Sequence, residues 1–369
     1  MSTAPQSRRR ILIVTEAGDA WPSGRIRALS YRKYFAADGF DVQYRTRLNP
    51  ALTKAILHPG RLSRRILDLG VGRLLAAANR CWARLGEARI ASRARSCDAV
   101  YLQKVLSPRL ISRLRRSTRA RLVFDLNDGL WLPWMGRFAG GNVGEMLKMV
   151  DAVTCDNPDG LEFARGYNTD GFVVPDPPQI ELFDQWRPRV RGSDSCVVLG
   201  WIGSASTAFN LFLIWEALER LFRRFENIQL RLIGAGYDWR LLPRFEKVKL
   251  TTVPFYSQEQ MVREVLAMDI GLFPLFDVED SLARGVLKAT VYMAGEACVV
   301  ASPVGQTRSL IRDGENGLLA ESNEWLQKLT ALVEDTSLRS RLATAGLQTV
   351  RENFTTRQCY EKLKAALDA

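Results

Sequence analysis

Arg284 to Gly317 reads R-G-V-L-K-A-T-V-Y-M-A-G-E-A-C-V-V-A-S-P-V-G-Q-T-R-S-L-I-R-D-G-E-N-G. Apolar residues fall at helical spacing over 287–294. The apolar run 297–301 follows at once and has the length of a buried strand. The segment 302–305 ends that strand, and 306–312 has the composition of a further helix start. The stretch therefore predicts a helix, a strand, a loop and a second helix in succession.

Two cations and a glycine-containing loop in this stretch have the chemistry of a phosphate site. Arg284 and Lys288 lie one turn apart at the beginning of the first predicted helix. Gly305, Gln306 and Thr307 open the second, where unpaired amides and a glycine that permits close backbone approach suit a diphosphate. We predict that the two cations and the three loop residues bind a diphosphate. The alternative for the cations is surface charge on a helix.

These residues also carry a family resemblance. The runs L-K-A-x-x-Y-M-A, V-V-A-S-P-V-G and I-R-D-G-E-N-G-L-L resemble the donor-binding core of retaining glycosyltransferase family 4, also called glycosyl transferases group 1. The resemblance continues upstream through 198–204, 230–236 and 269–275 and is weaker in the N-terminal half. It implies the α/β fold called GT-B, in which two Rossmann-like, doubly wound domains face each other across a cleft.

The resemblance extends the donor site to two further segments. Gly203 and Ser204 follow a predicted strand, and their backbone amides are candidates for phosphate contact; a plain helix cap is the alternative. Phe255 and Tyr256 fall where relatives hold the nucleotide base.

One departure from the family pattern concerns two glutamates. Relatives often carry E-x7-E across the helix start, and here Ala283 and Val291 occupy the matching positions. Asp277, Glu279 and Asp280 lie just upstream, where they could replace the lost sugar contact or simply solvate a loop.

The function implied by the resemblance is transfer of a hexose or related sugar from a nucleotide-diphosphate sugar, with retention of configuration. The acceptor would be a lipid-linked molecule, a polysaccharide or another glycan. Arg284 and Lys288 would be catalytic, since they would stabilise the departing diphosphate, and the loop residues 305–307 would bind the donor. The donor is a substrate, so no cofactor and no metal are expected. Two alternatives are a degenerate binding or scaffold protein, suggested by Ala283 and Val291, and a nucleotide-sugar epimerase.

Length and composition fit this organisation. A chain of 369 residues favours two domains, which we place at 1–180 and 181–369, with the last helix crossing back to the N-terminal domain. The segment Gln179 to Asp194 has the proline and charge content of a linker. Six scattered cysteines favour reduced thiols in a cytoplasmic protein. A single histidine, His58, leaves little room for histidine-based metal sites or catalytic triads.

Positive charge is concentrated in the N-terminal third. Residues 1–121 contain 26 Lys and Arg but 7 Asp and Glu. Within it, 51–97 is a basic insertion in which Leu74, Trp82 and Leu85 recur at helical intervals among arginines. Such a helix suits an anionic membrane surface, so we expect a protein that is peripheral on the inner face of the membrane. A helix packed on its own domain is the alternative; no motif supports nucleic acid.

The N-terminal half supplies candidates for the acceptor side. Gly24 and Arg25 lie in the loop and helix start after the first predicted strand, where Arg25 and Arg27 are candidate phosphate ligands. Asp125, Asn127 and Asp128 follow a later strand in D-L-N-D-G-L-W. Because carboxyl ends of parallel strands line the ligand crevice of α/β sheets, these three could bind acceptor hydroxyls or orient a basic residue. An Asx-type turn is the alternative.

Overall fold

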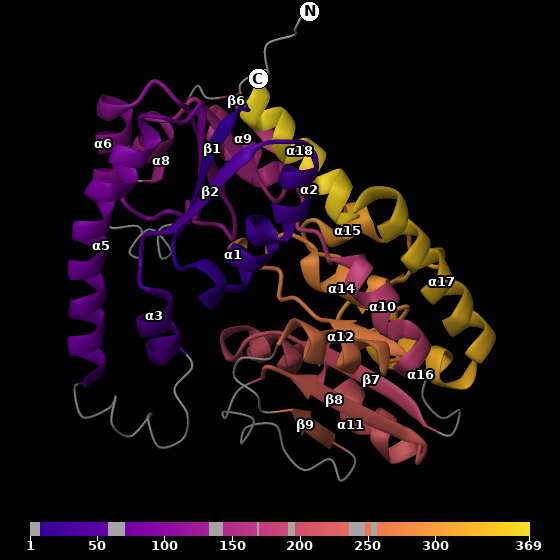
Figure 1. Ribbon diagram of the computed structural model, residues 1–369. Helices are drawn as coiled ribbons and strands as arrows, with labels where there is room; N and C mark the ends of the chain where they lie inside the picture. The colour runs from indigo at the N-terminus through magenta and orange to yellow at the C-terminus, as the bar shows by residue number, and fades with distance from the viewer. Residues whose placement is uncertain are drawn as a thin grey trace, which may run out of the picture. The chain divides into compact units, whose positions relative to one another are not determined.

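The computed structural model forms two compact units (Figure 1). The first comprises residues 1–176 and 357–369, and the second comprises residues 177–356. The residues whose structure is described are 8–57, 71–132, 143–167, 170–190, 196–235, 248–251 and 257–369.

The first unit is built on a six-stranded parallel sheet in the order β2-β1-β3-β4-β5-β6. Its elements, in chain order, are β1 (Arg10–Thr15), η1 (Gly18–Ala20), α1 (Pro22–Arg27), η2 (Leu29–Tyr31), α2 (Arg32–Ala37), β2 (Asp41–Thr46), α3 (Pro50–Leu57), α5 (Gly72–Ala94), β3 (Ala99–Gln103), α6 (Pro108–Ser117), β4 (Arg121–Leu126), α8 (Val143–Leu147), β5 (Ala152–Cys155), α9 (Pro158–Arg165), β6 (Asp170–Val173) and α18 (Thr356–Asp368).

Both faces of this sheet are covered, as the unbroken apolar run of β1 requires. Leu12 and Val14 point into a core shared with α5, α6 and α8. Ile11 and Ile13 point the other way, into a core shared with α2 and α18. The alternation of successive side chains therefore divides one strand between two cores.

Helix α18, at the C-terminal end of the chain, completes the second of these cores and lies beside α2 in Figure 1. Tyr360 is fully buried and its ring stacks on Tyr34 at 5.5 Å between centroids. Asp38 accepts hydrogen bonds from Lys364 Nζ at 2.6 Å and Tyr360 Oη at 3.0 Å. The hydrogen bond from Lys364 is the main reason that the pKa of Asp38 lies below its ordinary value.

The second unit repeats the design with a sheet in the order β12-β11-β10-β7-β8-β9. Its elements are α10 (Ile180–Val190), β7 (Val197–Ile202), η4 (Ala205–Ile214), α11 (Trp215–Arg224), β8 (Ile228–Ile233), β9 (Val248–Thr251), α12 (Gln258–Leu266), β10 (Ile270–Phe273), α13 (Glu279–Leu282), α14 (Leu287–Ala294), β11 (Cys298–Ala301), α15 (Thr307–Leu310), β12 (Leu318–Leu319), α16 (Trp325–Glu334) and α17 (Thr336–Asn353).

The predicted linker at Gln179 to Asp194 is wrong over most of its length. Residues 180–190 form α10, whose Ile180 and Phe183 are buried in the core with α12 and α14. These two buried apolar side chains pack α10 against the core. The charged residues and proline of the same segment had instead suggested a linker.

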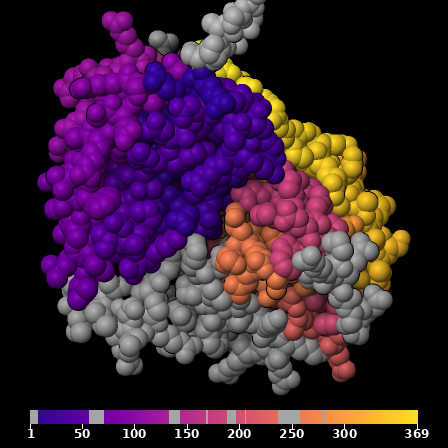
Figure 2. Space-filling model, in the orientation of Figure 1, coloured from indigo at the N-terminus to yellow at the C-terminus, as the bar shows by residue number. Residues whose placement is uncertain are grey.

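Helix α5 lies on the outside of the first unit, and its surface is part of the purple region of Figure 2. The face it buries carries small and polar residues, including Asn79, Ala83 and Glu87. Leu74 and Leu85 are 70% and 73% exposed, and Trp82 is 49% exposed. The apolar stripe predicted from the sequence is therefore turned away from the core. Residues 58–70 of the basic insertion lie outside the described part of the chain.

We expect Leu363→Ala to destabilise the first unit by about 2–5 kcal/mol, because Leu363 is fully buried in the core that α18 completes. Hydrogen exchange of the amides in β1 and β3 measures this unit separately. Lys362→Ala, on the exposed side of the same helix, is the control and should leave exchange unchanged. Equal protection in both variants would contradict the assignment of α18 to this core.

Candidate functional site

Each sheet has one point at which the strand order reverses. In the first sheet β1 lies between β2 and β3, and in the second β7 lies between β8 and β10. Ligands of doubly wound folds bind outside the carboxyl ends of the strands at such a point. In this protein those positions are the carboxyl ends of β7 and β10 in the second sheet and of β1 and β3 in the first.

Lys288 lies at the reversal point of the second sheet. Its Nζ donates a hydrogen bond to Thr207 Oγ1 at 3.1 Å and lies 4.8 Å from the centre of the Trp201 ring. Burial lowers the pKa of Lys288 to about 7, and the positive charge of Arg284 contributes to the same shift. The two predicted cations thus act on each other, and Lys288 changes its charge near neutral pH.

Gly203 makes room for this lysine. A Cβ atom at position 203 would lie 2.4 Å from the Trp201 ring and 2.9 Å from Lys288 Nζ. Its backbone amide donates to Ile233 O at 3.0 Å, which extends the pairing of β7 with β8. The Gly203 amide was predicted to contact phosphate, but it is hydrogen-bonded within the sheet. A glycine is needed at this position because a Cβ atom would collide with the Trp201 ring and Lys288 Nζ.

Ser204 and Thr207 form the turn that presents the hydrogen-bond acceptor to Lys288. Ser204 N donates to Thr207 Oγ1 at 3.3 Å, and Thr207 N donates to Ser204 O at 2.9 Å. Ser204 is the residue before η4, so it serves as a cap at the beginning of that helix. Thr207 was not singled out from the sequence, because its contact with Lys288 joins residues that lie 81 positions apart.

The loop that follows β11 is held by its own threonine. Thr307 Oγ1 donates to Ser302 O and accepts from Val304 N at 2.9 Å, and Thr307 is 1% exposed. Gly305 has a φ of +54°, and a Cβ there would lie 3.2 Å from the backbone of Leu282. Gln306 precedes the short helix α15. Gly305 therefore permits the loop to pack against the end of α13.

The two positions at which the resemblance implies acids are apolar and buried in this chain. Ala283 and Val291 are 4% and 6% exposed, and Val291 belongs to the core around β10 and β11. Asp277 and Glu279, the upstream acids, are exposed. The predicted base-binding residues Phe255 and Tyr256 lie outside the described residues.

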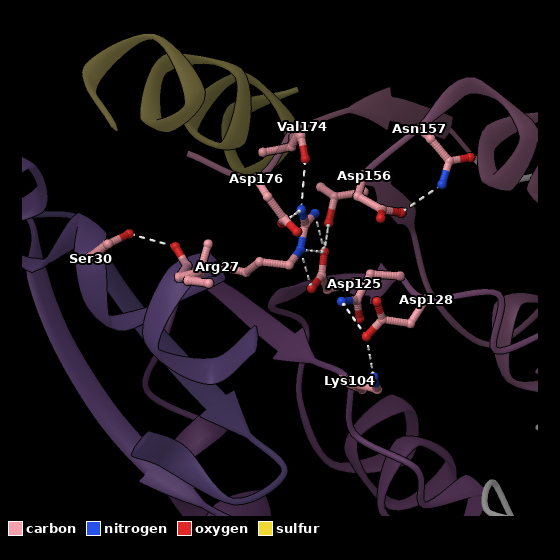
Figure 3. A network of polar contacts seen from close by, with 12 residues as sticks. Arg27, Ser30, Lys104, Asp125, Asp128, Asp156, Asn157, Val174 and Asp176 are labelled. Carbon is pink, nitrogen blue, oxygen red and sulfur yellow. Dashed lines mark hydrogen bonds and ion pairs between the residues drawn. The ribbon is translucent and has the colours of Figure 1, made fainter. Parts of the chain in front are cut away.

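Arg27 is the centre of a buried charge network in the first unit (Figure 3). Its guanidinium donates to Asp125 through Nε at 2.8 Å and Nη2 at 2.7 Å, to Asp176 through Nη1 at 2.5 Å, and to Val174 O at 2.8 Å. Burial opposes its charge, but the carboxylates of Asp125 and Asp176 outweigh burial and raise the pKa of Arg27. Thr154 Oγ1 also donates to Asp125, at 2.8 Å.

The suggestion that Arg27 could bind a phosphate is wrong, because its side chain is fully buried and held by two carboxylates. Asp125 is equally buried, so this carboxylate orients a basic residue. Asp156 lies beside the network, and burial together with Asp176 raises its pKa well above the ordinary value.

Gly24 and Arg25 lie at the carboxyl end of β1. A Cβ at Gly24 would lie 2.1 Å from Gly18 O, so α1 could not approach the preceding loop with any larger residue. Arg25 Nη1 donates to Asp19 O at 3.0 Å and is partly buried. Arg25 is thus the accessible arginine of the predicted pair.

Asn127 and Asp128 directly follow the strand β4 and lie beside Lys104, which follows β3. Lys104 Nζ lies 2.5 Å from Asp128 Oδ2, and Asn127 Nδ2 donates to the same oxygen at 3.2 Å. Lys104 was not identified from the sequence, because only the pairing of β3 with β4 brings it next to Asp128.

A family model described as glycosyl transferases group 1 matches residues 196–335. All of the matched residues lie within the second unit. The complete chain is similar to a crystal structure of Anabaena HepE in complex with UDP and glucose, with a TM-score of 0.65 and 15% identity over 98% of this chain and 99% of that one. The protein has a GT-B fold, as the sequence predicted.

Two curated relatives match parts of the chain. The phosphatidyl-myo-inositol mannosyltransferase of Mycobacterium leprae (strain TN) is 24% identical over 69% of this chain and 65% of its own length. The D-inositol 3-phosphate glycosyltransferase of Nocardioides sp. is 31% identical over 27% of this chain and 21% of its own length. The chain thus matches about two thirds of one relative and about a fifth of the other.

Burial of Lys288 makes the stability of the second unit depend on pH. Between about 7 and its ordinary pKa of 10.5 the unfolded chain binds a proton at Lys288 that the folded chain does not. Stability should therefore rise with pH across this window. We expect the unfolding free energy of Lys288→Met to lack this rise with pH. Urea unfolding, followed by hydrogen exchange of the amides in β7 and β10, measures that free energy for the second unit. The control Lys362→Met should retain it, and an identical pH profile in Lys288→Met would contradict the burial.

Proposed function

We propose that this protein transfers a sugar from a nucleotide-diphosphate sugar to an acceptor hydroxyl, with retention of configuration. The observation that carries the proposal is Lys288, which is partly desolvated beside Trp201 and Thr207 at the reversal point of the group 1 domain. A diphosphate placed there would bring negative charge against the Lys288 ammonium group. Arg284, one turn earlier, would be the second cation.

The proposed transfer needs no reactant other than the donor and the acceptor. The acceptor oxygen forms a bond to the anomeric carbon while the bond from that carbon to the β-phosphate oxygen breaks. The leaving phosphate takes the acceptor's proton, so no histidine or separate base is needed. Negative charge on the diphosphate grows as the bond breaks, and Lys288 in its cationic form stabilises it. Because the pKa of Lys288 is about 7 in the free protein, diphosphate binding should draw a proton onto it.

The donor and acceptor are proposed by class. HepE was crystallised with UDP and glucose, so UDP and GDP are suitable first probes for this chain. The acceptor classes are lipid-linked molecules and glycans, and the names of the two curated relatives both contain an inositol compound.

A second candidate, binding without catalysis, is favoured by one observation. Ala283 and Val291 are buried and apolar where relatives present acids, so contacts to the sugar and the ribose that those acids make are missing. A binding or scaffold protein would hold the nucleotide without turning it over.

Substitution of Lys288 separates the two candidates. Lys288→Ala should lower turnover about 100-fold while weakening UDP binding much less, because the contact strengthens as charge develops on the leaving group. Single-turnover assays with radiolabelled UDP-sugars and calorimetry with UDP measure the two effects. Lys328→Ala, in α16 of the same unit, is the control.

Two results would contradict this account of catalysis. Unchanged turnover and unchanged UDP affinity in Lys288→Ala would show that the diphosphate binds elsewhere. Tight UDP binding by the wild type, with no transfer or hydrolysis of any UDP- or GDP-sugar, would instead favour the scaffold.

We further propose that α5 binds an anionic membrane surface. The exposed apolar side chains of Leu74, Trp82 and Leu85 lie opposite the buried face of the helix, with Arg73, Arg80 and Arg84 exposed on the same helix. This is the arrangement of an interfacial helix. No helix in the part of the chain that the structure describes is long and apolar enough to span a membrane.

Sedimentation with vesicles tests this surface. Replacing Leu74, Trp82 and Leu85 with serine should reduce binding to phosphatidylserine-containing vesicles, and salt should weaken the wild type by screening the arginines. Phe212→Ser, which removes a side chain that is 47% exposed in the second unit, is the control. Equal recovery of wild type and triple variant at low salt would contradict the proposal.

A further inference from the structure

A pocket of about 630 Å³ lies at the amino end of the second sheet. It is lined by Val197, which begins β7, by Asp269, which directly precedes β10, and by Glu296, which lies two residues before β11. All of its lining residues belong to the second unit. Because β7 has six residues and each adds about 3.3 Å, the two ends of this strand are about 17 Å apart. The pocket is therefore separate from Lys288, which lies at the carboxyl end of β7.

The size and lining of this pocket are those of a small-molecule site. Such sites measure about 300–1,000 Å³ and combine apolar walls with a few polar groups. Here apolar side chains of β7, α12 and α17 are combined with Arg187 of α10, Arg231 of β8 and Arg339 of α17. Two of these arginines are paired with carboxylates, since Arg187 lies 3.0 Å from Glu296 Oε2 and Arg231 lies 3.4 Å from Glu264 Oε2. The third arginine is not compensated in this way.

Arg339 donates only to neutral acceptors. Its Nη1 donates to Leu332 O at 2.6 Å and its Nη2 to Thr336 Oγ1 at 3.3 Å. In the part of the chain that the structure describes, no carboxylate pairs with it. Asp335, directly before α17, instead accepts from Leu338 N at 2.9 Å and does not line the pocket. An uncompensated positive charge therefore lies in the first turn of an 18-residue helix, where the helix dipole also favours an anion.

Glu296 lines the same pocket from an uncommon backbone conformation. It follows α14 with a φ of +60°, at a helix end where glycine is the usual residue. Its Oε2 accepts from Arg187 Nη1 at 3.0 Å, and Arg187 Nη2 donates to Ala294 O at 2.8 Å. Arg187 also lies 3.5 Å from Asp184, so its charge is balanced within the fold. Left-handed non-glycine residues cluster at ligand sites, and this one places a carboxylate acceptor at the pocket.

The lining selects a ligand that carries two kinds of group. Arg339 and the hydroxyls of Thr336 and Ser340, all on α17, are donors for an anion whose oxygens only accept, such as phosphate. Glu296 and Asp269 are acceptors, and Asp269 Oδ2 already accepts from the backbone of β7 at 2.7 Å. A bare anion has no proton to offer these carboxylates, but the hydroxyl groups of a sugar or polyol donate to them. A phosphate ester of a polyol satisfies both halves.

We propose that this pocket binds a phosphorylated sugar or polyol. Its phosphate group accepts from Arg339, Thr336 and Ser340, and its hydroxyl groups donate to Glu296 and Asp269. The site shares no residue with the region around Lys288, so it is a second ligand site and does not rest on the proposed transfer. A ligand that binds only the folded state stabilises it, so the ester should raise the stability of the second unit.

Calorimetry of the full-length protein with ribose 5-phosphate and with glycerol 3-phosphate tests the site. We expect Arg339→Met to weaken binding of the ester about 10- to 100-fold, the factor of a hydrogen bond to a charged group, and Ser340→Ala to weaken it about 3- to 10-fold. Arg339→Lys keeps the charge and should recover part of the lost affinity. Ser340 is exposed, so alanine there preserves the helix and this variant reports on the site even if Arg339→Met unfolds.

Two matched variants serve as controls. Arg341→Met removes an exposed cation from the same helix that does not line the pocket, and it should leave the affinity for both esters unchanged. Lys288→Ala should also leave it unchanged, because Lys288 lies at the other end of the sheet. Ribose without phosphate should bind more weakly than ribose 5-phosphate, since it leaves Arg339 without an anion.

The possible results separate the pocket from the region around Lys288. Binding that weakens in Arg339→Met and Ser340→Ala, but not in Arg341→Met, supports the pocket. No binding of either ester, or equal affinity in the wild type and these variants, overturns it. Affinity that is lost in Lys288→Ala and kept in Arg339→Met places the phosphate near Lys288 and rejects the pocket. None of these measurements requires sugar transfer, so failure of this site leaves the proposed function standing.

Discussion

The packing at the carboxyl end of β7 in the second unit depends on the partial burial of one ammonium group, that of Lys288. Lys288 lies against Trp201 and bonds to Thr207 at the carboxyl end of β7. That placement requires a glycine at position 203, since any side chain there would collide with the tryptophan ring and the ammonium group. It also requires the turn that directs Thr207 inward. The cost of desolvation appears as a pKa near 7, and an anion is the ligand that would remove this cost.

The buried cation of the first unit, Arg27, is neutralised by carboxylates of the same unit. Arg27 is fully desolvated, but two carboxylates, Asp125 and Asp176, neutralise it within the fold. This network is a structural support for α1, β4 and the segment after β6. Its effect is to hold the carboxylates of Asp125 and Asp176 in ion pairs within the fold. The two units therefore differ in how a buried cation is compensated: Arg27 is neutralised by carboxylates of its own unit, whereas Lys288 has a lowered pKa.

The sequence was sufficient for the fold because short apolar runs, each followed by a glycine or capping residue and a periodic helix, repeat along the chain. The sequence also predicted the helix whose first turn carries Lys288, which is α14. It failed at Arg27, because nothing local indicates that Asp125 and Asp176, about 100 and 150 residues later, converge on that side chain. Lys104 and Thr207 were missed because their partners, Asp128 and Lys288, lie 24 and 81 positions later in the chain. The roles of the individual site residues, including the loop at Gly305, stay predictions, and Phe255 and Tyr256 lie outside the described residues.

The most direct test of the account is the pKa of Lys288 with and without a nucleoside diphosphate. NMR titration of protein labelled at the lysine side-chain carbons and nitrogens, with Lys288→Arg used for assignment, measures it in solution. The account predicts a pKa near 7 in the free protein and a clear rise when UDP or GDP is bound, because the diphosphate favours the charged amine. An ordinary lysine pKa in the free protein, or a low pKa that saturating nucleotide leaves unchanged, would contradict it.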